Sequence, residues 1–248
     1  MFNIVNSPVV KIGIHQPDFL PWTGFFNKYL LSDKFVFLDD AQFSKGGSDW
    51  TNRTLVSNNG NPKWITLPVG RNYSGVRLVN EIFISNPLQN KIEILRTIEG
   101  LYRNHTYFPE IYEFLKMTIN LEDDSLAVYN HNLIQAIIDL LRLPTKEKFF
   151  SSKLMCEKKG NERLVEIIKK LNGNLYLSGE GGKNYIKVET MESQEIELHW
   201  INYKQPQYVQ IGSLNFIPGL SILDNLMNLG IEGTKAYLER GIPKGEFK

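Results

Sequence analysis

The sequence predicts an α/β fold with a largely parallel sheet, flanking helices and a helical block in the middle of the chain. Short apolar runs rich in β-branched and aromatic residues alternate with segments whose apolar residues recur at helical spacing. Between about residues 87 and 147 only the helical spacing remains. We therefore expect a single domain over 1–248, with α/β parts at about 9–86 and 148–212 around a helical block at about 87–147.

The first α/β part opens with a strand, a helix and a strand at residues 9–38. VVKIGI and KFVFL are short apolar runs typical of buried strands, and GFFNKYLLS between them has helical spacing. The polar stretch AQFSKGGSDWTNRTLVSNNGNPKW shows little periodicity and predicts a long loop, which in a compact domain is usually functional or disordered. WITLPV predicts a further strand, and RNYSGVRLVNEIFIS is expected to contain another.

The helical block is expected to hold three helices, with Pro87 near a helix start and Pro144 after the last one. Their segments are NPLQNKIEILRTIEGLYRNH, YFPEIYEFLKMTI and SLAVYNHNLIQAIIDLLRL. Strands and helices then alternate again through KFFSSKL, NERLVEIIKKLNG, NLYLSGEGGKNYI and EIELHWINYKQPQYVQ. LSILDNLMNLG and TKAYLERG predict closing helices.

Composition excludes several classes of protein. The 248 residues are 42% hydrophobic and 12% aromatic, which is enough to bury an extensive core and argues against disorder. With 28 basic and 27 acidic residues the net charge is +1, so nothing favours nucleic acid or an anionic membrane as a partner, and local groups must hold any anionic ligand. The single cysteine, Cys156, excludes an internal disulfide framework and a multi-cysteine zinc site, and it fits a reducing cytoplasm.

Targeting signals are not evident in the sequence. The N-terminal MFNIVNSPVV lacks both a basic n-region and a long apolar h-region, and no stretch approaches the roughly 18 apolar residues of a membrane span. We expect a cytoplasmic protein without membrane insertion.

A histidine and two carboxylates follow the ends of two consecutive expected strands: His15 after the first, and Asp39 and Asp40 after the second. Ligands of open α/β sheets bind beyond the carboxyl ends of strands, so neighbouring strands would bring these groups to one rim. A carboxylate can fix the tautomer of a histidine that acts as a general base. The same residues could equally be a hydrogen-bonded loop histidine and aspartates that cap a turn.

The loop after the first strand contains two prolines, Pro17 and Pro21. Each fixes its own φ and biases the preceding residue, Gln16 or Leu20, away from the helical region, so we expect an extended loop that positions His15. The loop also supplies three of the substrate-binding candidates, which are Gln16, Asp18 and Trp22.

A second cluster, SKGGSDWTNRT, combines a cation, an indole, an amide and a guanidinium in Lys45, Trp50, Asn52 and Arg53. Arg suits phosphate by a bidentate fork, Lys by a point charge, and Trp can stack on a base or a sugar. These residues, with Gln42 before them, are candidates for binding a sugar nucleotide. A solvated loop with one buried Trp is the alternative interpretation.

The third candidate is YLSGEGGKNYI, a glycine-rich turn between an apolar run and an expected helix. Gly179, Gly181 and Gly182 would let backbone N–H groups approach an anion at a helix N-terminus. The turn could also simply connect the two elements. Its substrate-binding candidates are Ser178, Gly179 and Tyr185.

Several of these segments resemble one known family across nearly the whole chain. The run IGIHQPDFLPWTGFFNKYLLSDKFVFLDDAQFSK, followed by WTNRT, WITLPV, SSKL, YLSGEGGKNYI, YKQPQY and LSILDNLMNLG, is similar to the WbqC-like family. HQPDFLPW and LDDAQFSK are its most specific segments. The resemblance implies a small cytoplasmic protein of O-antigen and other surface-polysaccharide biosynthesis.

Such a pathway acylates or aminoacylates amino sugars that are carried on nucleotides. We therefore expect an N-acyl or aminoacyl transferase acting on a nucleotide-linked amino sugar, with His15 and Asp39 or Asp40 as the catalytic groups. The alternatives are a nucleotidyltransferase-like enzyme, although a second motif histidine is absent, and a non-catalytic sugar-nucleotide binding protein. The acyl donor is not identified, no cofactor and no metal-ligand set is evident, and the adjacent Asp39 and Asp40 would permit a magnesium ion.

Overall fold

The structure is a computed structural model that describes residues 8–44 and 50–242. The chain divides into two compact units, each assembled from three separate segments. The first, named the sheet unit, comprises Met1–His15, Lys28–Leu38 and Thr145–Asn202. The second, named the hairpin unit, comprises Gln16–Asn27, Asp39–Pro144 and Tyr203–Lys248. The expectation of a single domain over the whole chain stays a prediction.

The sheet unit is built on five strands in the order β5-β2-β1-β6-β7, and every neighbouring pair runs parallel. This confirms the α/β class and the largely parallel sheet. The strands are β1 (Lys11–His15), β2 (Lys34–Phe37), β5 (Glu147–Phe150), β6 (Leu175–Gly179) and β7 (Glu197–Ile201).

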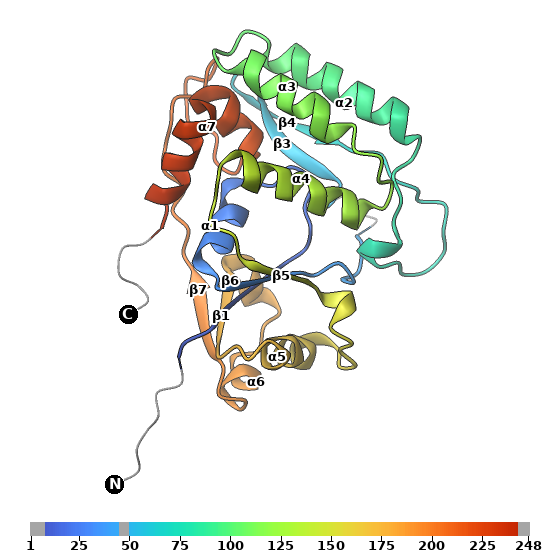
Figure 1. The fold of residues 1–248 in the computed structure, drawn as a ribbon, viewed down its shortest axis with the longest axis vertical. Coiled ribbons are helices and arrows are strands. Elements are labelled where there is room, and N and C mark those ends of the chain that lie inside the picture. The colour runs from blue at the N-terminus through green and yellow to red at the C-terminus, as the bar shows by residue number, and fades with distance from the viewer. Residues whose placement is uncertain (1–7, 45–49, 243–248) are drawn as a thin grey trace. The chain divides into compact units, whose positions relative to one another are not determined.

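One face of this sheet packs against α5 (Gly160–Lys170) and α6 (Val188–Glu192), which lie together in Figure 1. In α5 the apolar residues recur at spacings of three and four, so that one side of the helix is buried. Ile12, Ile14 and Val36 from the strands form a continuous apolar core with that side. Since these strands are covered by apolar packing, they read in the sequence as uninterrupted apolar runs.

The opposite face carries Gly13 and Phe35, and the Phe35 ring stacks edge-on against Tyr29 of α1 (Thr23–Leu31) at 5.5 Å. A Cβ added to Gly13 would lie 3.0 Å from the Phe35 ring and 3.1 Å from Cβ of Ser32, so glycine lets the chain pack closely here. Side chains alternate along a strand, and His15 therefore belongs to the same face as Gly13.

The hairpin unit combines an antiparallel hairpin with four of the longer helices. Figure 1 shows α2 and α3 side by side above the hairpin. The mid-chain helical block is confirmed, because α2, α3 and α4 follow one another without a strand. The elements are β3 (Arg53–Asn58), β4 (Asn61–Thr66), the 3₁₀ helix η1 (Val79–Glu81), α2 (Pro87–Tyr102), α3 (Phe108–Ile119), α4 (Leu126–Leu140) and α7 (Ile222–Arg240).

The hairpin corrects two expectations about the first α/β part. Strand β3 lies inside the polar stretch that predicted a long loop, and it turns into β4 through Asn59 and Gly60, whose φ angles are 48° and 78°. Positive φ at both positions is the geometry of the tight turn that Asn-Gly favours. The strand expected in RNYSGVRLVNEIFIS is wrong, since that segment forms η1 and isolated bridges such as Val69 with Ile84.

The closing helices meet at Gly230, where the backbone leaves the helical region with φ at 69°. A side chain at this position would collide with the neighbouring ring of Tyr107, because an added Cβ would lie 2.6 Å from it. Both φ and the close ring require glycine here. The two expected closing helices lie on either side of this kink, within the span labelled α7.

Candidate functional site

The direction in which the sheet is wound reverses between β1 and β6. From β1 the chain adds β2 and β5 on one side, and then places β6 and β7 on the other. Doubly wound sheets with this order bind nucleotides at the carboxyl ends of the strands that flank the reversal. The register pairs Gly13 with Leu177, so its continuation sets His15 level with Gly179 at that edge. The predicted residues His15, Ser178 and Gly179 therefore lie on the two strands that flank the reversal.

His15 is half-buried at the end of β1, and its carbonyl oxygen accepts a hydrogen bond of 2.8 Å from the N–H of Leu38. Lys28 of α1 lies at the same strand end, where its Nζ donates to the carbonyl oxygen of Ile14 at 3.2 Å. Only 8% of Lys28 is exposed. This buried cation was not predicted, because a lysine in a short amphipathic helix normally reaches solvent. One strand end thus combines an imidazole with an ammonium group.

The glycine-rich turn at the end of β6 has two kinds of glycine. A Cβ on Gly182 would overlap Oγ of Ser178 and would lie 2.8 Å from Ile186, so packing requires glycine there. A Cβ on Gly179 or Gly181 would meet nothing within 4 Å, and neither residue has a positive φ. Internal packing therefore does not require glycine at these two positions.

The turn itself forms the 3₁₀ helix η3 (Glu180–Asn184), and the helix expected after it, α6, begins at Val188 and has only five residues. It is too short to build up the dipole of a regular helix, so the prediction of an anion at a helix N-terminus is not supported. Ser178 is buried, and its Oγ donates to the carbonyl oxygen of Gly179 at 3.3 Å. Tyr185 is exposed at the end of the turn.

The loop at residues 16–22 belongs to the hairpin unit and is anchored there by side chains. Oγ1 of Thr51 donates to Oε1 of Gln16 at 3.0 Å, and Nδ2 of Asn130 donates to the carbonyl oxygen of Pro17 at 2.8 Å. Asp18 is buried. The ring of Trp22 packs edge-on against Tyr203 at 5.6 Å between centroids, so this candidate has a structural contact of its own.

Leu20 corrects the prediction of an extended loop. Its φ is 44°, in the left-handed region that residues other than glycine seldom adopt. Two hydroxyl groups hold its carbonyl oxygen, Oγ1 of Thr54 at 2.8 Å and Oγ of Ser221 at 2.7 Å. Proline disfavours the right-handed helical region for the residue before it, and these two hydrogen bonds stabilise the left-handed conformation in its place.

Asp39, Asp40 and Gln42 also belong to the hairpin unit. Asp39 is 5% exposed, and Nδ2 of Asn80 approaches its Oδ2 at 3.5 Å while the backbone N–H of Asn80 donates to its carbonyl oxygen at 2.8 Å. Asp40 is half-buried and Gln42 is exposed. The pairing of His15 with one of these carboxylates stays a prediction, since His15 belongs to the sheet unit.

The second predicted cluster is only partly assembled as expected. Lys45 lies outside the described residues. Asn52 is buried, and its Nδ2 donates to the carbonyl oxygen of Leu67 at 3.0 Å, which is a structural role. Arg53 places its guanidinium carbon 4.1 Å from the centroid of the Trp64 ring, and Trp50 packs edge-on against the same ring at 4.9 Å. Trp64 was missed, because it joins the cluster through the hairpin register.

The comparisons with known proteins identify the family. The WbqC-like protein family matches residues 16–236 of the chain. The chain belongs to this family. A relative from Mycobacterium tuberculosis (strain ATCC 25618 / H37Rv), the uncharacterized protein Rv1507c, is 30% identical over 228 residues, which cover 90% of this chain and 95% of the relative. No solved structure gives a significant match. The resemblance seen in HQPDFLPW, LDDAQFSK and the later segments is thereby confirmed.

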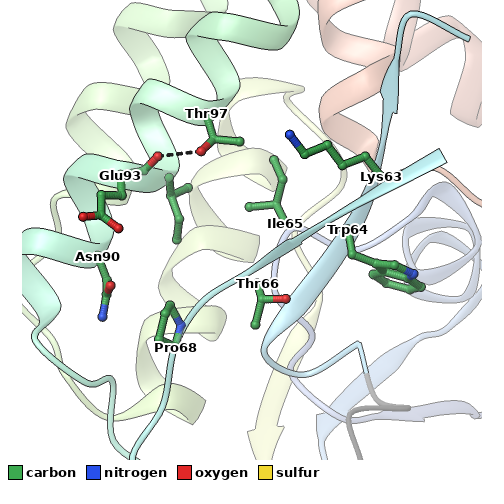
Figure 2. Close-up of a pocket in the computed structure, with 9 residues that line it drawn as sticks. Lys63, Trp64, Ile65, Thr66, Pro68, Asn90, Glu93 and Thr97 are labelled. Carbon is green, nitrogen blue, oxygen red and sulfur yellow. Dashed lines mark hydrogen bonds between the residues drawn. The ribbon is translucent and has the colours of Figure 1, made fainter. Parts of the chain in front are cut away.

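This WbqC-like chain has a groove of about 240 Å³ between β4 and α2 that no predicted site residue lines. Figure 2 shows Lys63 and Ile65 directed toward α2, whereas the ring of Trp64 points away from it. On the helix side, Oγ1 of Thr97 donates to the carbonyl oxygen of Glu93 at 2.8 Å. Lys63 makes no hydrogen bond or ion pair with the residues that the structure describes.

A buried carboxylate ties the hairpin of this family member to its last helix. Asp224 of α7 is fully buried and accepts hydrogen bonds from the hydroxyl groups of Tyr102 at 2.9 Å and Tyr208 at 2.7 Å. Burial raises the pKa of Asp224, and the two tyrosine hydroxyls act in the opposite direction. The hydroxyl of Tyr102 also accepts from the N–H of Ser57 in β3 at 3.3 Å. YKQPQY and LSILDNLMNLG, two segments of the WbqC-like resemblance, meet in this network.

Over residues 8–44 and 50–242, no group of three or more His, Cys, Asp and Glu side chains is arranged to hold a metal ion. Within the same residues, none of the helices combines the length and the apolar character that crossing a bilayer requires.

Proposed function

We propose that this WbqC-like chain is an enzyme of surface-polysaccharide biosynthesis, an N-acyl or aminoacyl transferase that acts on a nucleotide-linked amino sugar. Family membership supports the pathway that the resemblance implies. The observation that carries the reaction is the reversal of the sheet between β1 and β6, because it brings His15 and the Ser178–Gly179 turn to the edge where doubly wound sheets bind nucleotides.

His15 is the proposed general base. The imidazole would take a proton from the amine of the sugar as the amine nitrogen forms a bond to the carbonyl carbon of an activated acyl or aminoacyl donor. The leaving group of that donor then departs, so the sugar gains the acyl group and nothing is oxidised or reduced. Asp39 or Asp40 as the group that orients His15 stays a prediction from the sequence.

The glycine turn supports a bound ligand near this edge. Neither packing nor backbone conformation requires glycine at Gly179 and Gly181, whereas both explain why a side chain is excluded at positions such as Gly230. A ligand that approaches the main chain closely would exclude side chains from the turn in the same way.

Mass spectrometry tests the proposal directly. The protein is incubated with nucleotide-linked amino sugars and with thioester-activated or adenylate-activated acyl and aminoacyl donors. The expected product is the sugar nucleotide plus the mass of the transferred group, formed by the wild-type protein and lost in His15→Gln. An unchanged sugar with every donor, combined with tight binding of the sugar nucleotide, would exclude acyl transfer and leave the nucleotidyltransferase and binding-protein alternatives.

Nucleotidyl transfer is the second candidate, and Lys28 favours it. A buried ammonium group at the same strand end as His15 is suited to stabilising charge on a phosphoryl group, and the same sheet edge accommodates nucleotides. In this reaction an oxygen of a sugar phosphate attacks the α-phosphorus of a nucleoside triphosphate and pyrophosphate leaves. Pyrophosphate release that depends on Lys28 would favour this candidate over acyl transfer.

A further inference from the structure

We infer that Arg53 and Trp64, on the outer face of the hairpin, form a binding site for a nucleoside diphosphate, with the phosphates on Arg53 and the base on Trp64. This inference goes beyond the proposed function, because it gives the hairpin unit a nucleotide-binding surface of its own, in addition to the one proposed at the sheet edge. It makes Trp64 a nucleotide-binding residue that the sequence did not indicate.

The hairpin register places the cluster on one face. Arg53 pairs with Thr66 and Leu55 pairs with Trp64, so these side chains point to the same side of the two strands. The other side carries Val56 and Ile65, which are buried. In Figure 2 the ring of Trp64 points away from α2, as this alternation requires. Around Arg53 and Trp64 the outer face is only partly covered, since Arg53 is half-buried and Trp64 is exposed.

Arg53 has the donors of a phosphate-binding residue and no acceptor to receive them. Its guanidinium makes no hydrogen bond or ion pair with any residue in the described part of the chain, and its Nε is buried without a partner. A buried donor without an acceptor is costly, which points to a ligand that supplies one. The stack on Trp64 at 4.1 Å fixes the plane of the fork, as bidentate binding of a phosphate requires.

Trp64 supplies the aromatic surface. It is 39% exposed, which is unusual for a side chain of this size, and Trp50 holds it edge-on at 4.9 Å. The guanidinium of Arg53 covers one face of the ring, so a base would stack on the other face. Such stacking raises affinity by roughly 5- to 150-fold and depends little on the identity of the base. The phosphates of such a nucleotide would lie beside the adjacent guanidinium.

A mononucleotide fits this surface better than a nucleic-acid strand. Binding of a strand needs a track of basic residues along which the phosphates run. The chain has a net charge of only +1, and the cluster offers a single guanidinium among the described residues. One base and one diphosphate match one indole and one arginine.

Calorimetric titration of the full-length chain tests the inference. The ligands are UDP, dTDP, ADP and GDP, with uridine as a probe that lacks phosphate and pyrophosphate as a probe that lacks a base. Trp64→Ala and Arg53→Ala should each weaken the best-bound diphosphate by about 5- to 150-fold. Trp64→Ala should weaken uridine most and pyrophosphate less, because the guanidinium of Arg53 loses the ring that fixes its plane, whereas Arg53→Ala should weaken pyrophosphate and leave uridine bound. Lys63→Ala, on the other face of β4, is the matched control and should leave all affinities unchanged.

Melting temperatures of the variants show whether the fold is kept, which is expected because both side chains lie on the outer face. If no diphosphate binds the wild-type protein, or if both variants bind it as tightly as the wild type does, the inference is wrong. Acyl transfer by a Trp64→Ala protein with unchanged sugar-nucleotide affinity would overturn this site and keep the proposed function. Diphosphate binding that depends on Trp64, without transfer to any amino sugar, would keep this site and overturn the proposed function.

Discussion

The carboxyl edge of the sheet unit and the outer face of the hairpin hold their polar groups by different means. At the sheet edge the main chain fixes them, because the His15 carbonyl accepts from Leu38 and the Ile14 carbonyl accepts from Lys28. On the hairpin, side chains fix one another, with Arg53 and Trp50 packed on Trp64. Atoms that react need fixed positions, whereas a stacking surface tolerates different bases. The first arrangement is suited to chemistry and the second to binding.

The largest expected effect is at the sheet edge. His15→Gln and His15→Ala should lower the rate of transfer by roughly 10²–10⁴-fold, because a general base is lost, while the melting temperature changes little. His199→Gln is the control, since His199 lies on β7 of the same sheet and has no assigned role. Rates are measured by product mass. If the His15→Ala protein is as active as the wild type, the reaction does not take place at the sheet edge, and the contrast with the binding face of the hairpin fails.

The sheet unit could be predicted from sequence because its signals are local. Apart from Lys11 and Lys34, VVKIGI and KFVFL are apolar since both faces of their strands are covered, and the helix between them is short. The largely parallel direction of the strands was predicted, but their order and the reversal between β1 and β6 could not be, because these depend on which strands pair across more than a hundred residues. The family resemblance indicated the segments but not their pairing.

Strand β3 was missed for the opposite reason, although the turn signal is present, whereas WITLPV indicated the end of β4. Strand β3 contains Thr54 and Ser57, which are buried by contacts far along the chain, so no apolar alternation marks the strand. Asn59-Gly60 is the signal that identifies it. Trp64 and Lys28 were missed because the register of a hairpin and the burial of a lysine are decided by tertiary packing.

Within the glycine turn, packing requires glycine at Gly182 but not at Gly181. Gly182→Ala should destabilise the protein by about 1–3 kcal/mol, because its Cβ would overlap Ser178 and press on Ile186 and Trp200. Gly181→Ala should change the free energy of unfolding by less than about 0.5 kcal/mol, since nothing lies near its Cβ.

Urea denaturation measures both variants of the turn. If a ligand approaches the main chain at Gly181, the Gly181→Ala protein should fold normally and bind the sugar nucleotide more weakly. Equal destabilisation by the two substitutions would contradict the packing difference. If Gly181→Ala binds the sugar nucleotide with full affinity, the ligand does not approach the main chain at this turn.

A smaller effect is expected at the tip of the hairpin. Gly60 and Gly75 share a positive φ, at 78° and 74°, so alanine at either position should cost roughly 1–2 kcal/mol in backbone strain. Only at Gly60 does a neighbour add to this cost, because the carbonyl oxygen of Gly212 would lie 2.6 Å from the new Cβ. Gly60→Ala should therefore be the more destabilised in urea denaturation. Equal losses of stability in the two variants would show that the segment around Gly212 moves aside at no cost, and that only the turn itself stabilises the hairpin tip.

The smallest expected effect is a dependence of folding stability on pH. It tests whether the buried carboxylate of Asp224 helps to hold the hairpin. The hydroxyl of Tyr102 links the N–H of Ser57 in β3 to the buried carboxylate of Asp224. Burial raises the pKa of Asp224 above its ordinary value, so the folded state binds more protons than the unfolded state between the unfolded and the folded pKa. The stability contributed by this group is fully present below the unfolded pKa and is lost as pH rises through the folded pKa.

Asp224→Asn should remove this pH dependence from melting temperatures recorded from acid to neutral pH. Tyr208→Phe should extend the slope to higher pH, because the Tyr208 hydroxyl lowers the pKa of Asp224 and would be lost. The same slope in all three proteins would mean that the buried carboxylate does not govern the anchoring of the hairpin.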